Sequence, residues 1–302
     1  IRISPTRCRI SPGATAGTEG SGVPDQPSVG KAPSNLTLRV ISALVLAPVV
    51  LLAVWAGGIV FSALIIAIAV LGFWEWTQMS GPQDPEWTRP GLAGALACGL
   101  LALHFHQWEL AVIFIVTPAI AALVIGCAAE PQKWAGMGIF YVALPAAGLI
   151  LIRSGGPTGL AAVVFIMLVV WATDIVAYFG GRSIGGPKLW PRVSPNKTWS
   201  GGICGLAAAM TVGIAMSVYL FGEARFGDIL VAAILSVFSQ AGDFLESGVK
   251  RRFGAKDSGN LIPGHGGVLD RVDGLFGAAA VALLLSVAGM GSILPELGVF
   301  HG

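Results

Sequence analysis

The sequence predicts an all-α, polytopic integral membrane protein with about nine transmembrane helices. Of its 302 residues, 55% are hydrophobic and only 11% are charged, and its mean hydropathy is +0.78, which is too apolar for a soluble domain of this size. The apolar residues also gather in runs close to the roughly 20 residues that a helix needs to cross a bilayer. The net charge is only +2, so no general basic field favours nucleic acid as a partner.

Nine apolar runs are long enough to be counted as transmembrane helices. In chain order they cover residues 39–56, 58–77, 91–107, 109–128, 137–153, 157–180, 201–221, 228–249 and 275–293. Two joints are very short, at 57–58 and at 106–108, so the helices beside each joint could instead form one broken hairpin. The four cysteines are scattered and mostly lie in apolar runs, which favours small core residues over disulfides or zinc ligands.

The segment before the first apolar run has a different composition. Residues 1–38 are rich in Pro, Gly, Ser and Thr and contain no apolar run, which predicts a disordered tail. We expect residues 39–302 to form a single membrane-embedded domain. Within it, 39–153 would supply N-terminal helices and 157–293 the helices and loops that carry the chemistry.

Basic residues set the predicted orientation, because Lys and Arg concentrate on the cytoplasmic side of membrane proteins. The loop at 181–200 has four of them and the loop at 250–274 has five. Two predicted helices separate these loops, so both should face the cytoplasm. Counting back places the tail at 1–38 in the cytoplasm, and counting forward places the C-terminus outside.

The densest cluster of charge lies at 247–273, with the sequence SGVKRRFGAKDSGNLIPGHGGVLDRVD. It combines five cations with three aspartates in a chain that has few charges, and its six glycines and one proline predict a loop. Glycines let the backbone approach a ligand, cations complement phosphate oxygens, and carboxylates hold the divalent cation that polyphosphates carry. The stretch therefore indicates a site for a metal-bound nucleotide or phosphoester.

The order of residues in this stretch resembles the signature of the phosphatidate cytidylyltransferases, the CDP-diacylglycerol synthases. The positions that carry the resemblance are Ser247, Val249, Lys250, Arg251, Lys256, Asp257, Gly259, Ile262, Pro263, His265, Gly266, Gly267, Val268, Asp270, Arg271, Val272 and Asp273. The resemblance is most specific over 171–274. It implies the transfer of CMP from CTP to phosphatidate, giving CDP-diacylglycerol and pyrophosphate, in a bacterial cytoplasmic (inner) membrane with catalytic loops facing the cytoplasm. It also implies Mg²⁺ as the cofactor, allows a second, monovalent cation, and favours a homodimer.

Two earlier segments supply further candidate site residues. Asp174 lies inside an apolar run, where an ionised carboxylate is costly unless it is paired or faces a wet cavity, and Tyr178 lies one turn further on. We expect both to line a polar substrate cavity, and a bond from Asp174 to a neighbouring helix is the alternative. The segment 194–198 resembles the Ser-Pro-x-Lys-Thr/Ser element of the same family. This implies that Lys197 contacts a nucleotide phosphate while Ser194 and Thr198 donate hydrogen bonds.

One position in this segment departs from the family pattern. Ser200 stands where many relatives carry Glu or Gln. If that Glu or Gln helps to hold the cofactor or the base, another residue must take this role here. A patch for lipid headgroups, without catalysis, is the alternative reading of this loop.

A polar helix face leads into the signature stretch. Asp243, Glu246 and Lys250 follow at helical spacings, and Asp243 lies 27 residues before Asp270, far enough for the chain to fold back. Mg²⁺ takes a few carboxylates while keeping waters and substrate phosphates. We therefore expect Asp243 and Asp270 to be the metal ligands, with Asp273 as an alternative ligand.

The other charged residues of the stretch are assigned to the phosphates. We expect Lys250 and Arg271 to act in catalysis together with the two aspartates, and Arg251 and Lys256 to bind substrate phosphates. His265, between glycines, would contact the substrate or donate to a phosphate, and a simple structural bond is its alternative.

Two other functions remain as alternatives. A CTP-dependent polyprenol or phytol kinase would direct a lipid hydroxyl to the γ-phosphorus and release CDP in place of pyrophosphate. An ion-coupled transporter would place its acids at the membrane midplane. Here the acids gather at the cytoplasmic side, and the sequence has no evident inverted repeat of broken helices.

Overall fold

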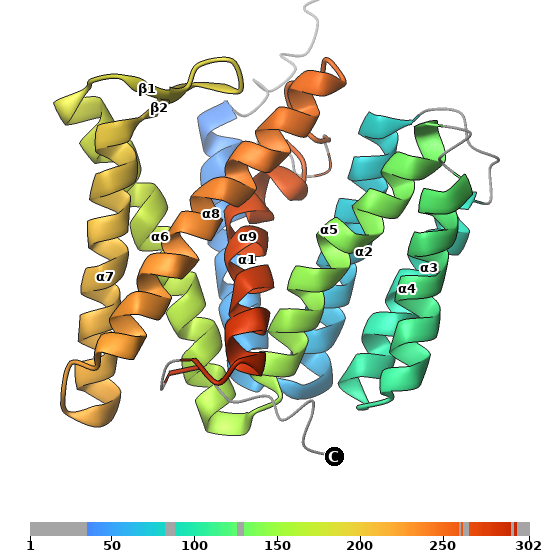
Figure 1. The fold of residues 1–302 in the computed structure, drawn as a ribbon, viewed down its shortest axis with the longest axis horizontal. Helices are drawn as coiled ribbons and strands as arrows, with labels where there is room; N and C mark the ends of the chain where they lie inside the picture. The colour runs from blue at the N-terminus through green and yellow to red at the C-terminus, as the bar shows by residue number, and fades with distance from the viewer. Residues whose placement is uncertain are drawn as a thin grey trace, which may run out of the picture. The chain divides into compact units, whose positions relative to one another are not determined.

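Figure 1 shows a computed structural model of the protein, which describes residues 35–81, 88–125, 130–259, 261, 266–290 and 293–294. The regular structure of these residues consists of nine α-helices and one two-stranded sheet. The helices are α1 (Asn35–Ala56), α2 (Gly58–Ser80), α3 (Thr88–His104), α4 (Trp108–Ile125), α5 (Glu130–Arg153), α6 (Gly156–Ile184), α7 (Trp199–Phe221), α8 (Phe226–Arg252) and α9 (Leu269–Val287). The strands are β1 (Lys188–Trp190) and β2 (Ser194–Thr198).

Each apolar run predicted from the sequence corresponds to one of these helices, and both short joints separate distinct helices. Residues 1–34 of the predicted tail lie outside the described residues. α1 begins at Asn35, so residues 35–38, which were predicted to belong to the tail, are helical. The all-α class is confirmed, with one small sheet added.

Six of the helices are long and apolar enough to cross a membrane, as judged over the described residues. They are the helices at Gly58–Ser80, Trp108–Ile125, Gln132–Arg153, Gly156–Ile184, Trp199–Phe221 and Phe226–Arg252. An integral membrane protein is therefore confirmed, whereas nine crossings stay a prediction. Apolar side chains such as Tyr219 (83% exposed) and Val124 (64% exposed) cover the outside of these helices, as expected for surfaces that face lipid.

The helices that carry the candidate site pack closely on one another. α6 packs on α7, α7 on α8 and α8 on α9, while α5 joins α9 to α2 (Figure 1). The contact between α8 and α9 depends on small residues, as is common between membrane helices. A Cβ atom added at Gly242 would lie 2.5 Å from the backbone oxygen of Asp273 and 3.0 Å from the Cα atom of Gly277. This close crossing brings the polar end of α8 against the first turns of α9.

The predicted basic loop at 181–200 is a β-hairpin over much of its length. Its strands are antiparallel, with Lys188 opposite Thr198 and Trp190 opposite Ser194. α6 ends at Ile184, and the next residue, Gly185, has a φ of 69°, in the left-handed region that glycine tolerates. The hairpin lies at the ends of α6 and α7 in Figure 1.

Candidate active site

A cavity of about 740 Å³ lies between α6, the hairpin, α7 and α8. Five of the predicted site residues line it, namely Asp174, Tyr178, Lys197, Thr198 and Asp243. They come from α6, the hairpin and α8, so the fold brings three separate segments of the sequence to one cavity.

The hairpin is held over this cavity by hydroxyl groups at its base. Thr198 Oγ1 accepts a hydrogen bond from the backbone N–H of Gly201 (3.1 Å) and thereby caps the start of α7. Ser200 Oγ lies 3.0 Å from Thr198 Oγ1 and donates to the carbonyl of Gly185 at the end of α6. In this protein Ser200, which departs from the family pattern, thus ties the hairpin to α6.

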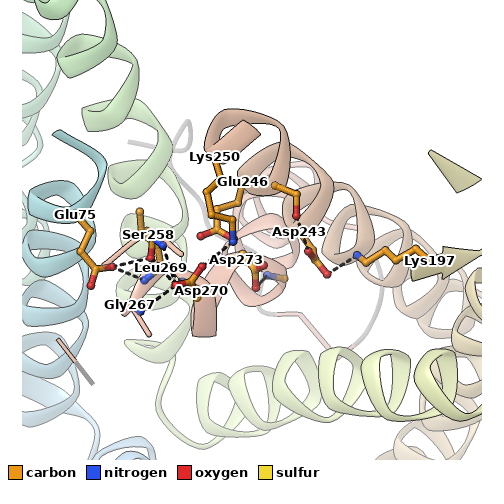
Figure 2. Close-up of polar contacts among 12 residues, drawn as sticks. Glu75, Lys197, Asp243, Glu246, Lys250, Ser258, Gly267, Leu269, Asp270 and Asp273 are labelled. Atoms are coloured by element: carbon orange, nitrogen blue, oxygen red, sulfur yellow. Dashed lines mark hydrogen bonds and ion pairs between the residues drawn. The ribbon is translucent and has the colours of Figure 1, made fainter. Parts of the chain in front are cut away.

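An ion pair joins the hairpin to α8 inside the cavity. Lys197 Nζ contacts Asp243 Oδ2, and the same ammonium group lies 4.5 Å from the centre of the Phe244 ring. The two charged side chains are 29% and 33% exposed. Both therefore remain accessible to a ligand that enters the cavity, and Figure 2 shows the contact between them.

Further polar residues complete the cavity wall. Arg182 donates to the Tyr178 hydroxyl (3.2 Å), and Lys188 Nζ lies 3.4 Å from the carbonyl of Asn196. With Lys197, these side chains give the cavity three cations, which suits a ligand with several phosphate oxygens. Gln240 also lines the cavity; the sequence interpretation omitted it, although it lies three residues before Asp243 on the same helix.

A second polar cluster lies where α8 meets α9. Lys250 Nζ donates to Glu246 Oε2 (2.9 Å) and to Asp270 Oδ1 (2.6 Å). The other oxygen of Asp270 accepts from Ser258 N (2.9 Å), Ser258 Oγ (3.0 Å) and Gly267 N (2.9 Å). Burial alone would raise the pKa of Asp270, but the hydrogen bonds from Lys250, Gly267 and Ser258 outweigh it and lower this pKa below its ordinary value. Asp270 is therefore an ionised carboxylate with both oxygens in use.

Asp273 lies one turn further along α9 and has a different environment. Burial first, and then the negative charges of Asp243 and Glu246, raise the pKa of Asp273 to about 9. Glu246 Oε1 is buried and has no hydrogen-bond partner among the described residues. The buried Asp273 thus lies close to two other carboxyl groups, those of Glu246, which binds Lys250, and Asp243, which binds Lys197.

Other predicted residues lie away from the cavity. Ser194 pairs with Trp190 in the hairpin, and Arg251, Lys256 and Arg271 are exposed. None of these four residues lines the cavity. His265 lies outside the described residues.

Glu75 in α2 is a site residue that the sequence interpretation missed. Its carboxylate is 1% exposed and accepts hydrogen bonds from the backbone N–H groups of Val268 (2.8 Å) and Leu269 (2.9 Å), where α9 begins. These bonds help α9 to start at Leu269, six residues before the predicted position. A lone acid in an apolar span was the available signal.

The fold and the cavity together define a class of protein. Two helices that are long and apolar enough to cross a membrane, α6 and α8, contribute the carboxylates of Asp174 and Asp243 to one cavity, and the hairpin contributes cations to it. Figure 1 shows these elements, and Figure 2 shows the contact between Lys197 and Asp243. This is a membrane-embedded protein with a polar site suited to a phosphate-bearing, metal-associated ligand.

Comparison with known proteins identifies the family. Residues 37–288 match the Cytidylyltransferase family, and the chain belongs to this family. It is 45% identical over 252 residues to a phosphatidate cytidylyltransferase of Brucella melitensis, a match that covers 83% of this chain and 93% of the relative. It is 38% identical over 275 residues to a phosphatidate cytidylyltransferase of Pseudomonas aeruginosa, covering 85% of this chain and 99% of the relative. The family predicted from the signature stretch is confirmed.

Proposed function

We propose that this protein transfers CMP from CTP to phosphatidate, giving CDP-diacylglycerol and pyrophosphate. Relatives that match over nearly their whole length are named phosphatidate cytidylyltransferases. The observation that carries the proposal is the cavity in which Lys197 of the hairpin meets Asp243 of α8. It offers cations for phosphate oxygens and a carboxylate for a metal in one accessible space.

The reaction explains why cations line the cavity. A phosphate oxygen of phosphatidate attacks the α-phosphorus of CTP, a new P–O bond forms, and the bond to the β-phosphate breaks with its electron pair leaving on pyrophosphate. Phosphatidate is already ionised, so no side chain has to remove a proton from it. Both reactants are polyanions and repel each other. Lys197, Lys188 and Arg182 reduce this repulsion and orient the phosphates.

Mg²⁺ is the proposed cofactor, and the contacts of Asp270 favour replacing it, among the ligands expected from the sequence, by Asp273. Asp270 already binds Lys250 and the backbone, whereas Asp243 lines the accessible cavity and Asp273 is close enough for the charge of Asp243 to raise its pKa. We therefore assign the metal to Asp243 and Asp273, and to Asp270 the task of holding Lys250. No three His, Cys, Asp or Glu side chains in the described part of the chain form a metal site by themselves, so phosphate oxygens and water would complete the coordination.

Bound there, Mg²⁺ would draw negative charge from the transferring phosphoryl group. A second, monovalent cation and a homodimer stay part of the proposal on the strength of the family resemblance. The basic hairpin and the basic end of α8 support a site that faces the cytoplasm from a bacterial inner membrane. Phosphatidate would then enter from the bilayer and CTP from the cytosol.

One experiment tests the activity directly. The purified protein is incubated in detergent with phosphatidate, Mg²⁺ and CTP labelled at the α-phosphate. We expect a labelled lipid and one pyrophosphate for each lipid formed. Release of CDP without labelled lipid would contradict the proposal and favour a kinase, and an Asp243→Asn sample controls for contaminating activity.

A further inference from the structure

Glu75 is the only acidic or basic residue in the sequence of α2, and its surroundings point to a role in the reaction. Its carboxylate is buried, a position that is costly for a charge unless hydrogen bonds satisfy it. Oε1 accepts from the N–H of Val268 (2.8 Å), while Oε2 accepts from the N–H of Leu269 (2.9 Å) and lies 3.1 Å from Ser258 Oγ (Figure 2). A single side chain from α2 therefore holds two separate points of the signature stretch.

The first of these points is the start of α9. The opening turn of a helix leaves backbone N–H groups unpaired and favours a negative charge beside it. The residue at the N-cap position is Val268, whose side chain accepts no hydrogen bond. Glu75 supplies the missing acceptor from a position more than 190 residues earlier in the chain.

The glycines of the signature stretch leave room for this carboxylate. A Cβ atom added at Gly259 would lie 2.6 Å from Glu75 Oε1, and one added at Gly267 would lie 2.7 Å from Glu75 Oε2. Both distances are too short for a real contact. At Gly259 the absence of a side chain thus leaves room for a residue outside the signature, and at Gly267 it leaves room for the Ser258 hydroxyl as well as for Glu75.

The second point is Ser258, which links Glu75 to the polar cluster. Its hydroxyl lies within hydrogen-bond distance of Glu75 Oε2 (3.1 Å) and of Asp270 Oδ2 (3.0 Å), and its backbone N–H also donates to Asp270 (2.9 Å). Asp270 in turn holds Lys250 at 2.6 Å. A continuous set of contacts therefore runs from α2 to the ammonium group of Lys250.

We propose that Glu75 is a positioning residue: by fixing the start of α9 and Ser258, it sets the place of Asp270 and thereby of Lys250, which the sequence assigns to catalysis. The inference rests on the proposed cytidylyltransferase function. It assigns to α2, which the signature does not include, a part in catalysis. It also distinguishes Glu75 from the acids that would bind metal, because its oxygens are already taken by backbone N–H groups and Ser258.

The test compares Glu75→Gln with Asp228→Asn in full-length, purified protein. Asp228 is a matched control, because it is also 1% exposed and accepts from a backbone N–H group, that of Ile293 (3.1 Å), at the opposite end of α8. We expect Glu75→Gln to lower kcat about 10- to 100-fold, with the KM for CTP changed less than about threefold. Asp228→Asn should lower thermal stability while leaving the kcat of the folded protein unchanged.

Hydrogen–deuterium exchange supplies a readout that does not depend on activity. In Glu75→Gln the amides of Val268 and Leu269 should exchange faster, and those of α7 should not change. An unchanged kcat, or a loss of activity only in proportion to the loss of folded protein, would overturn the proposal. If wild-type protein made no labelled lipid, the proposed function would fail, and the exchange data would still decide whether Glu75 holds this segment.

A milder variant keeps the test decisive if Glu75→Gln does not fold. Ser258→Ala removes the hydroxyl that links Glu75 to Asp270, but leaves in place the backbone contacts of Glu75 and the hydrogen bond from the backbone N–H of residue 258 to Asp270. We expect its kcat to fall as well, and the double variant to be no worse than the more affected single variant, because both act through one set of contacts. An unaffected Ser258→Ala enzyme, or additive losses in the double variant, would show that Glu75 does not act through Ser258 and Asp270.

Discussion

Replacing Lys250 with methionine should lower the free energy of unfolding by about 3–5 kcal/mol, the usual cost of removing one partner from a buried ion pair. Lys250 is 14% exposed and lies between Glu246, which is 0% exposed, and Asp270, which is 10% exposed. At 2.9 and 2.6 Å, each contact has a Coulomb energy of about 6 kcal/mol at an effective dielectric constant near 20. Desolvation of the three groups offsets much of this energy in the wild type. In the variant, two carboxylates stay buried without their shared cation.

Thermal unfolding of the purified protein in detergent, followed by tryptophan fluorescence, measures this effect. A loss of 3–5 kcal/mol corresponds to an apparent Tm that is lower by roughly 6–15 °C. Adding Glu246→Gln to Lys250→Met should restore part of the loss, because it removes one of the uncompensated charges. Lys188→Met serves as the control, since Lys188 is exposed and should change Tm very little. A Lys250→Met protein as stable as the wild type would refute the reasoning.

Three further predictions concern the cavity and the helix crossing. Asp243→Asn should reduce the formation of labelled lipid by about 100-fold or more, because it removes charge from the proposed metal site with little change in shape; turnover within threefold of wild type would contradict this. Lys197→Ala should raise the KM for CTP about tenfold, as expected for the loss of one charge-assisted hydrogen bond. An unchanged KM for CTP would favour the alternative, in which the hairpin binds lipid headgroups. Gly242→Ala should cost about 1–3 kcal/mol of stability and also lower kcat, because the added methyl group would meet the backbone of Asp273 at 2.5 Å; an alanine variant with normal Tm and kcat would show that the two helices can separate freely.

Hydropathy predicted the helices because apolar runs of the right length dominate this sequence. The largest shifts occur at the start of α5, which begins at Glu130 and not at the predicted 137, and at both ends of α9, which covers Leu269–Val287 and not the predicted 275–293. Both helices open with polar turns, which a search for apolar runs does not detect. In α9 the polar turn is stabilised from another helix by Glu75, and no local pattern contains that information.

The sequence also predicted part of the site. The position of Asp174 in an apolar run, with Tyr178 one turn further on, correctly predicted that both line a polar cavity. The hairpin was not predicted, because its glycines and prolines indicate a loop equally well. The sequence could not show which acid Lys250 binds, since Glu246, Asp257, Asp270 and Asp273 are all within reach of a flexible chain. The tertiary structure makes that choice.

Lys197 and Asp243 neutralise each other across two elements, a hairpin and a membrane helix, that no short loop connects. A nucleotide alone would attract the lysine and leave the aspartate without a counterion, and a metal ion alone would do the reverse. A metal–nucleotide complex would give both side chains a new partner at once. The contact between Lys197 and Asp243 would therefore favour binding of the complete complex over binding of the nucleotide or the metal alone.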